Sequence, residues 1–372
     1  LLFMSHYFER MGDSMLNIGE SLLSASLGER IKIDEFRALR ESVEDSDAFE
    51  TEVSPDLLAV EALGETRSGC RIDRVSDRSK DEERMVVFKE GPADKLLGEK
   101  KCVDRWNELL PGFAPQIYSF QHRENSGAIL FEYLPGRTFE ELVLRSEPRL
   151  LSEGLEHLQA SLREIWTRTR EDRPTRSDFI HQIAKRIDSV YELHPDFRTG
   201  NVSFGGLQVD PFDSLIERLL PIDDLLESPF SVLGHGDLNL DNVIFDDAQK
   251  AIRFIDLHRS RPMDYAQDLS VFLVSHFRLQ VLELPVRRRI QDVISVMHDF
   301  AVDFADEVGD ETFGVRLAAG LARSFVTSAR FILDEEFAKN LFFRGRYLLE
   351  QLVAQPPNAI QEYWAPGEIL LD

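Results

Sequence analysis

Polar residues suited to phosphate chemistry gather in the segment HGDLNLDN at positions 235–242 and just beyond it. Asp237 and Asn242 lie five residues apart, and Asp256 ends a short apolar run further along the chain. Phosphoryl transfer depends mainly on positioning the reactants and neutralising charge. It needs a carboxylate that accepts a hydrogen bond from the attacking hydroxyl, and oxygen ligands for Mg²⁺ on the phosphates. These three side chains predict such a site.

Two short apolar runs explain how the three side chains could meet. Val243–Phe245 and Ala251–Ile255 flank the polar turn DDAQK, a pattern that predicts a β-hairpin. The hairpin would return Asp256 to the loop that carries Asp237. An isolated HGD tripeptide is common, so the interpretation depends on the whole string, H-x-D-x-x-x-x-N followed by a strand that ends in Asp. Three further acids, Asp241, Asp246 and Asp247, are interpreted as turn and surface residues.

A lysine in an apolar strand supplies the cation that nucleotide phosphates require. Lys89 lies in the run MVVFKEG, where burying an ammonium without a partner would be costly. Glu99 lies in the helix predicted next and could hold Lys89 in place, as in kinases that use a Lys–Glu pair. Glu90 and Glu108 are alternative partners. An edge-strand charge remains the alternative interpretation of Lys89.

Two other segments are candidates for nucleotide contacts. The loop Gly64–Gly69, which includes Ser68, separates two predicted strands, and its glycines allow a close approach of backbone amides to phosphate. It lacks the pattern G-x-G-x-x-G, so a plain hairpin turn is the alternative. The segment from Ile129 to Gly136 is a strand that ends at a Pro-Gly turn.

The strings HGDLNLDNVIF and IRFIDL resemble the catalytic and metal-binding segments of the aminoglycoside phosphotransferase family, which includes choline kinase-like enzymes. The resemblance implies that Asp237 is the catalytic base. It implies that Asn242 and Asp256 hold Mg²⁺. It also implies that His235 supports the loop and that Asp268 braces the loop from the following helix.

The resemblance extends to the nucleotide side of the site. It places Lys89 on the phosphates of ATP or GTP, with Glu99 as its partner. It suggests that backbone groups from Glu132 to Leu134 meet the purine edge, and that the loop with Ser68 covers the phosphates. The family lacks a strict glycine pattern in that loop, so the departure seen here is compatible with membership.

The elements that must position these residues fall into three segments. Residues 1–55 predict an acidic, helical N-terminal extension. Residues 56–134 alternate β-rich runs with one helix near 93–110, which predicts an antiparallel nucleotide-binding lobe. Residues 135–372 are mostly helical and form the predicted catalytic and substrate-binding lobe. The fold class is therefore α+β, and the resemblance implies a two-lobe protein-kinase-like fold.

The segment after Asp256 indicates which kind of acceptor to expect. Neither Phe-Gly nor Ala-Pro-Glu follows Asp256, and no room remains for an activation loop before Asp268. This favours a kinase that acts on a hydroxyl of a small molecule. Acids such as Asp223 and Asp303 suggest a cationic acceptor such as an amino sugar, although acids on helices are commonly just solvated. The alternatives are a protein-directed kinase or nucleotidyl transferase, and a non-catalytic nucleotide-binding module.

Composition restricts the remaining partners. The 372 residues carry a net charge of −24, which repels nucleic acids and anionic membranes. No apolar run is long enough to span a membrane. Two cysteines without metal-ligand spacing fit a reducing cytoplasm. We expect a small-molecule hydroxyl substrate and a nucleoside triphosphate as partners, with a homodimer or protein contact through residues 1–55 as a further candidate.

Overall fold

The computed structural model places the chain in two compact units. The first unit consists of Leu1–Pro135 and Arg253–His258, and the second of Gly136–Ile252 and Arg259–Asp372. The structure describes residues 2–27, 32–46, 58–65, 70–77, 85–123, 126–198, 200, 202–204, 207–356 and 359–371.

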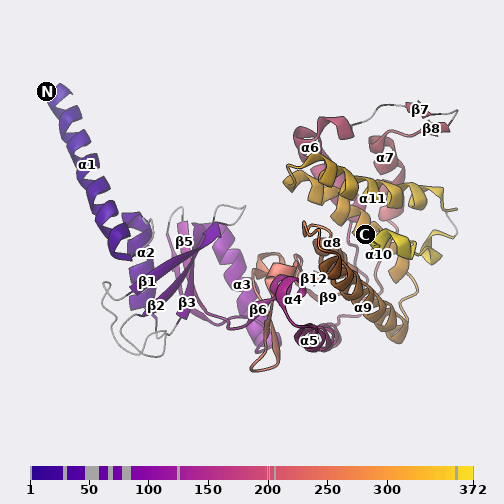
Figure 1. The fold of residues 1–372 in the computed structure, drawn as a ribbon, viewed down its shortest axis with the longest axis horizontal. Coiled ribbons are helices and arrows are strands. Elements are labelled where there is room, and N and C mark those ends of the chain that lie inside the picture. Colours follow the sequence, from indigo (N-terminus) through magenta and orange to yellow (C-terminus); the bar gives the residue numbers. More distant parts are fainter. Residues whose placement is uncertain are drawn as a thin grey trace. The chain divides into compact units, whose positions relative to one another are not determined.

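The first unit is built on an antiparallel sheet in the order β1-β2-β3-β5-β4 (Figure 1). Neighbouring strands along the chain pair as hairpins, except that β5 separates β3 from β4. The strands are β1 (Leu58–Glu65), β2 (Arg71–Asp77), β3 (Met85–Pro92), β4 (Ile117–His122) and β5 (Ser126–Glu132). This confirms the predicted antiparallel N-terminal sheet.

Side chains along a strand alternate between the two faces of a sheet, and both faces of this sheet are covered by helices. Val86 and Phe88 of β3 belong to a core that also contains Leu39 of helix α2 (Ile33–Glu44). Residues of odd number on β3 point the other way. Gly127, which pairs with Gly91, lies against Leu96 of helix α3 (Ala93–Leu109), so α3 covers that second face. Lys89 therefore points to the α3 side.

Two helices occupy the predicted N-terminal extension. Helix α1 (Leu2–Leu27) exposes large apolar side chains, among them Tyr7, Phe8 and Met11. Helix α2 instead buries Leu39 and Val43 against the sheet. Leu39 and Val43 lie four residues apart, so they share one face of this helix. The prediction of a dimer or partner contact through residues 1–55 stays a prediction.

The second unit is mostly helical, as predicted (Figure 1). Helices α6, α8, α9 and α11 pack against α10, whose described residues are all buried. The helices are α4 (Phe139–Arg145), α5 (Pro148–Arg168), α6 (Phe179–Leu193), α7 (Phe212–Asp223), α8 (Ala266–His276), α9 (Leu284–Val308), α10 (Phe313–Ser328) and α11 (Glu335–Ala354).

Small residues let α10 approach its neighbours closely. A Cβ atom added at Gly320 would lie 3.0 Å from Ser270 of α8 and 3.1 Å from the Phe179 ring of α6. The sequence FGVRLAAGLARSFVTS therefore suits a helix surrounded on every side by protein. Within it, Arg316 and Arg323 are the buried charges.

Short strands punctuate the helical unit. The predicted hairpin is present as β10 (Val243–Asp246) and β11 (Ala251–Phe254), and β10 also pairs with β6 (Arg137–Thr138). Along the chain, β11 begins in the second unit and ends in the first. The remaining strands form two pairs, β9 (Val232–Gly234) with β12 (Arg261–Met263) and β7 (Val202–Phe204) with β8 (Leu207–Val209).

Membrane insertion by a helix finds no support in the part of the chain that the structure describes. None of the helices described there is both long enough and apolar enough to cross a bilayer.

Candidate active site

Lys89 is the centre of a buried ion cluster in the first unit. Its ammonium donates to Glu99 Oε1 of α3 at 2.8 Å and to Asp256 Oδ1 at 2.9 Å. Lys89 is 4% exposed and Glu99 is 2% exposed. Burial alone lowers the pKa of Lys89, but the charges of Glu99 and Asp256 outweigh it, so the pKa is raised. The lysine is therefore a fixed, buried cation.

Asp256 is held by its side chain and by an unusual backbone. Its φ of 59° lies in the left-handed region, which is uncommon for an aspartate. His258 Nδ1 lies 3.2 Å from Asp256 Oδ1. Burial works to raise the pKa of Asp256, but the His258 hydrogen bond and the Lys89 charge hold it well below its usual value. The carboxylate is thus ionised at any pH near neutrality.

The end of strand β11 is anchored to the first unit just before Asp256. The Phe254 amide donates to the Phe113 carbonyl at 2.7 Å. The Phe254 ring lies 5.5 Å from the Trp106 ring of α3. These contacts fix where the chain delivers Asp256, because only one residue lies between Phe254 and that aspartate.

The loop with Asp237 is braced from helix α8. Asp268 accepts hydrogen bonds from the His235 amide at 2.6 Å and the Gly236 amide at 2.7 Å. Asp268 is fully enclosed, and burial raises its pKa despite the opposing interactions with His235 and Gly236. Gly236 has a φ of 83°, and a Cβ there would lie 2.6 Å from the Arg259 carbonyl oxygen, so the turn requires glycine.

Asp237 lies in a set of polar contacts within the second unit. Its Oδ1 accepts from Asn239 Nδ2 at 2.9 Å, and its Oδ2 lies 3.1 Å from Arg259 Nη1. Asn239 in turn accepts from Arg278 at 2.6 Å. The Asp237 amide also donates to His235 Nδ1 at 3.3 Å. The carboxylate is therefore oriented on both oxygens and still partly exposed, as a base must be.

Asn242 closes the loop through its amide group. Its Nδ2 donates to the Asp237 carbonyl at 2.9 Å, and the residue is 8% exposed. That bond uses the nitrogen and not the oxygen, which is the atom a metal ion would bind. Amide and carboxylate oxygens such as those of Asn242 and Asp256 are the donors that Mg²⁺ prefers. Among the described residues, no group of three or more His, Cys, Asp and Glu could hold a metal ion on its own.

The other predicted nucleotide contacts have mixed outcomes. Ser68 lies outside the described residues. The Glu132 amide already donates to the Gln116 carbonyl at 2.8 Å, and the Glu132 side chain accepts from the Gln116 amide at 3.0 Å. Leu134 is buried. The purine contact assigned to Glu132–Leu134 stays a prediction, and the Glu132 amide is committed to the chain itself.

Two acids have roles that the sequence did not indicate. Asp246, interpreted as a surface acid, is 4% exposed and accepts from the Ala248 and Gln249 amides in the hairpin turn. Asp223, a candidate for binding a cationic acceptor, is 2% exposed and accepts from the Ile180 amide at 2.9 Å, at the start of α6. Asp223 is thus part of the internal structure, because its lone pairs satisfy amides at a helix start.

Arginines around Asp237 were missed in the sequence. Arg259 follows Asp256 by three residues and contacts Asp237 directly, which proximity to a predicted site could have suggested. Arg323 sits in a helix of small and apolar residues, and a charge in such a run is a signal of functional or ion-paired burial. Arg186 lies on an ordinary amphipathic helix, and nothing in its surroundings in the sequence marks it.

Comparison with known proteins agrees with this geometry. A model of the phosphotransferase enzyme family matches residues 71–298, more than half of the chain. The chain belongs to this family. The chain is similar to the aminoglycoside 3′-phosphotransferases of Salmonella typhimurium and Escherichia coli, each 27% identical over 206 residues that cover 55% of this chain and 73% of the relative. The predicted family resemblance is confirmed, and the protein is a phosphotransferase that acts on hydroxyl groups.

A solved structure extends the likeness to the fold. The choline kinase of Cryptosporidium parvum Iowa II is similar with a TM-score of 0.51 and 13% sequence identity, over 88% of this chain and 98% of that chain. The predicted two-lobe kinase-like α+β fold is confirmed. At this identity the likeness concerns the fold and not the substrate.

Proposed function

We propose that this phosphotransferase moves the γ-phosphate of ATP or GTP to a hydroxyl group of a small molecule, with Mg²⁺. The observation that carries the proposal is the buried Lys89, which is bonded to both Glu99 and Asp256. A lysine in that setting is fixed and charged, as a cation for the α- and β-phosphates must be. Stability alone does not explain this cluster, because an apolar residue in place of Lys89 would need neither carboxylate as a partner.

Each residue has one task in this proposal. Lys89 binds the α- and β-phosphates, and Glu99 keeps it in position. Asp237 accepts a hydrogen bond from the acceptor hydroxyl and takes its proton as the oxygen attacks. Asn242 and Asp256 hold Mg²⁺, which when bound neutralises charge on the phosphates.

Supporting residues complete the assignment. Asp268 and His235 keep the loop in shape, and Ser68 with the backbone near Glu132–Leu134 contacts the nucleotide. Asn239 and Arg259 hold the Asp237 carboxylate at the orientation seen in the structure. Each carboxylate oxygen has two lone pairs, so the exposed part of Asp237 can still accept a hydrogen bond from the acceptor hydroxyl.

A variant pair tests the reaction. Purified protein is incubated with γ-labelled ATP or GTP, Mg²⁺ and a cell metabolite extract, and label transfer is followed by mass spectrometry. We expect Asp237→Asn to lower transfer by a factor of about 10² to 10⁴, because it removes the base. Lys89→Met should raise the KM for nucleotide. Asp247→Asn, in the exposed turn of the hairpin, is the matched control and should behave like the wild type.

Two outcomes would reject the proposal. Transfer by Asp237→Asn at the wild-type rate would remove Asp237 as the base. A labelled protein band without any labelled metabolite would identify a protein-directed kinase instead. The predicted cytoplasmic location stays a prediction.

A further inference from the structure

Arg323 is a buried cation without a carboxylate of its own. It is 7% exposed, on helix α10. Its guanidinium donates to Ser270 Oγ at 3.3 Å and lies 5.5 Å from the centre of the Phe179 ring. Its Nε is buried without a hydrogen-bond partner. No carboxylate of the described residues lies within ion-pair distance of it. Such a charge is costly to bury, so its retention calls for an explanation.

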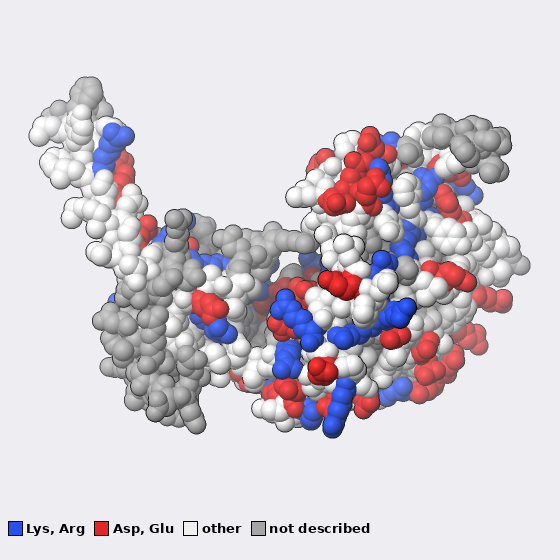
Figure 2. Space-filling view, in the orientation of Figure 1, with Lys and Arg blue, Asp and Glu red and all other residues white. Residues whose placement is uncertain are grey.

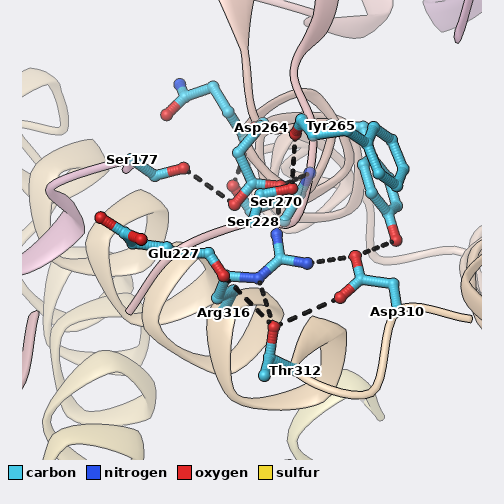
Figure 3. A network of polar contacts seen from close by, with 12 residues as sticks. Ser177, Glu227, Ser228, Asp264, Tyr265, Ser270, Asp310, Thr312 and Arg316 are labelled. Carbon is cyan, nitrogen blue, oxygen red and sulfur yellow. Dashed lines mark hydrogen bonds and ion pairs between the residues drawn. The ribbon is translucent and has the colours of Figure 1, made fainter. Parts of the chain in front are cut away.

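Arg316, on the same helix, shows what a structural arginine looks like in this protein. It is bonded to Asp264 and Asp310, and its Nε donates to Thr312 Oγ1 at 3.3 Å (Figure 3). Asp310 also accepts from Tyr265 at 2.7 Å. Every polar edge of Arg316 has a partner from the chain. Arg323 lacks this complement, although the chain carries 67 acidic and only 43 basic residues.

Arg186 is a second arginine without a carboxylate partner among the described residues, and it lies nearer to the surface than Arg323. It is half-buried on α6 and donates to Gln182 Oε1 at 2.9 Å, not to a carboxylate. Gln182 is 3.5 Å from Gln267 of α8, next to the loop brace Asp268. Arg323 reaches the same helix through Ser270. The two arginines thus flank the first turn of α8, which holds the loop with Asp237.

The electrostatic interactions of both arginines agree with these contacts around α8. Burial lowers the pKa of Arg323, and repulsion from Arg186 lowers it further. Burial and repulsion from Arg259 lower the pKa of Arg186 in the same way. Asp237 opposes the shift in both cases. Of these arginines, Arg259 contacts Asp237 directly at 3.1 Å, and Arg323 contacts Ser270 of the helix whose Asp268 holds the loop with Asp237.

The carboxylates in this environment are already in use. Asp268 accepts two backbone amides of the loop. Asp237 is bonded to Asn239 and Arg259, and its proposed task is to receive the acceptor proton. Arg278 is held at Asn239 and interacts electrostatically with Glu140. Among the described residues, neither Arg186 nor Arg323 has a carboxylate within ion-pair distance, so these two positive charges have no direct counterpart there.

We propose that the acceptor alcohol carries an anionic group, a carboxylate or a phosphate ester, which Arg186 and Arg323 bind while its hydroxyl lies at Asp237. The inference rests on the proposed function and specifies its substrate class. It replaces the cationic acceptor expected from the sequence, since Asp223 is committed to the start of α6. In Figure 2, acidic and basic side chains are interspersed over the visible face of the second unit, so overall charge does not identify the acceptor.

A matched set of acceptors tests the substrate class. Glucose, glucosamine, gluconate and glucose 6-phosphate share a carbon skeleton and differ in charge, and transfer from ATP is measured for each. We expect kcat/KM to be highest for gluconate or glucose 6-phosphate, and the better of the two distinguishes carboxylate from phosphate ester. Arg186→Met and Arg323→Met should each lower that value about 10- to 100-fold, as the loss of a hydrogen bond to a charged group does. Arg149→Met, whose side chain is 91% exposed on α5, removes the same charge and should change nothing.

A binding measurement keeps the inference separate from catalysis. The melting temperature is followed with inorganic sulfate at saturating Mg·ADP, against sodium chloride of equal ionic strength. Sulfate should stabilise the wild type and Arg149→Met, and stabilise Arg186→Met and Arg323→Met less. Absence of transfer to every acceptor, with this sulfate pattern intact, would count against the proposed function alone. Preference for glucosamine, or equal sulfate stabilisation in all four proteins, would overturn the anionic acceptor.

Discussion

Two arginines on helix α10 stand seven residues apart and have opposite surroundings. Arg316 is bonded to two carboxylates, Asp264 and Asp310, whose other contacts are also hydrogen bonds within the chain. Arg323 has a serine hydroxyl, an aromatic ring and an unsatisfied Nε. Both are buried on a helix that contributes no other charge. Burial alone therefore does not distinguish a structural arginine from one proposed to bind a ligand. The two arginines differ in their hydrogen-bond and ion-pair partners.

The difference shows how an active site differs from a core in its hydrogen bonding. A cluster that serves stability satisfies its own polar atoms, because each unpaired one costs about 1–3 kcal/mol. A site that must bind a ligand leaves some atoms to be satisfied by that ligand. The following changes test this distinction, in order of expected effect.

Loss of the Arg316 side chain should have the largest effect on stability. Arg316→Met leaves Asp264 and Asp310 buried without their cation, so we expect the free energy of unfolding to fall by about 3–5 kcal/mol. Urea unfolding measures it, and transfer per folded molecule should stay unchanged. Addition of Asp264→Asn and Asp310→Asn should recover part of the loss. If Arg316→Met is as stable as the wild type, the contrast between the two arginines does not hold.

Loss of the Asp268 carboxylate, which holds the loop with Asp237, should have an intermediate effect on both stability and turnover. Asp268→Asn leaves one of the two loop amides facing a donor, so we expect a loss of about 2–3 kcal/mol. The displaced loop should lower kcat about 10- to 100-fold, because small errors in the position of a base are costly. Steady-state kinetics and urea unfolding on the same preparations test this. An altered KM with normal kcat would contradict a positioning role.

Arg323 should be nearly dispensable for folding. Arg323→Met removes an unpaired buried charge and keeps most of the side-chain volume, so the free energy of unfolding should fall by no more than about 1 kcal/mol. Chemical denaturation beside Arg316→Met gives the direct comparison. A loss as large as that of Arg316→Met would assign Arg323 to the core.

Lys89 adds a third buried cation to the comparison of Arg316 and Arg323. Like Arg316 it contacts two carboxylates, but it lies at a proposed functional site. The lowered pKa of Asp256 means that its ionised form stabilises the fold above the unfolded value near 3.8, and that this contribution is lost as the pH falls below it. The stability of Asp256→Asn should therefore fall less steeply between pH 4 and pH 2 than that of the wild type. Urea unfolding across this range measures it, with Asp247→Asn as the control. Equal slopes would show that Asp256 gains no stability from Lys89.

Local sequence was sufficient for the elements and for part of the site. The sheet, the hairpin and the loop were predicted from the β-rich runs of residues 56–134, the polar turn after Phe245 and the string from His235 to Asn242. Each of these signals depends on residues close together in the chain. The cost of burying an ammonium predicted a partner for Lys89. The family resemblance favoured Glu99 over Glu90 and Glu108, and the structure pairs Lys89 with Glu99 at 2.8 Å.

The partners of those residues were decided by packing. Asp223 and Asp246 are acids in the sequence alone, and only the structure makes one a support for a helix start and the other part of a turn. Arg323 becomes informative only once α6, α8 and α10 surround it without a carboxylate. Short-range pattern thus predicted which groups perform chemistry. Tertiary structure determined which charges remain unsatisfied, because that depends on contacts between residues far apart in the chain.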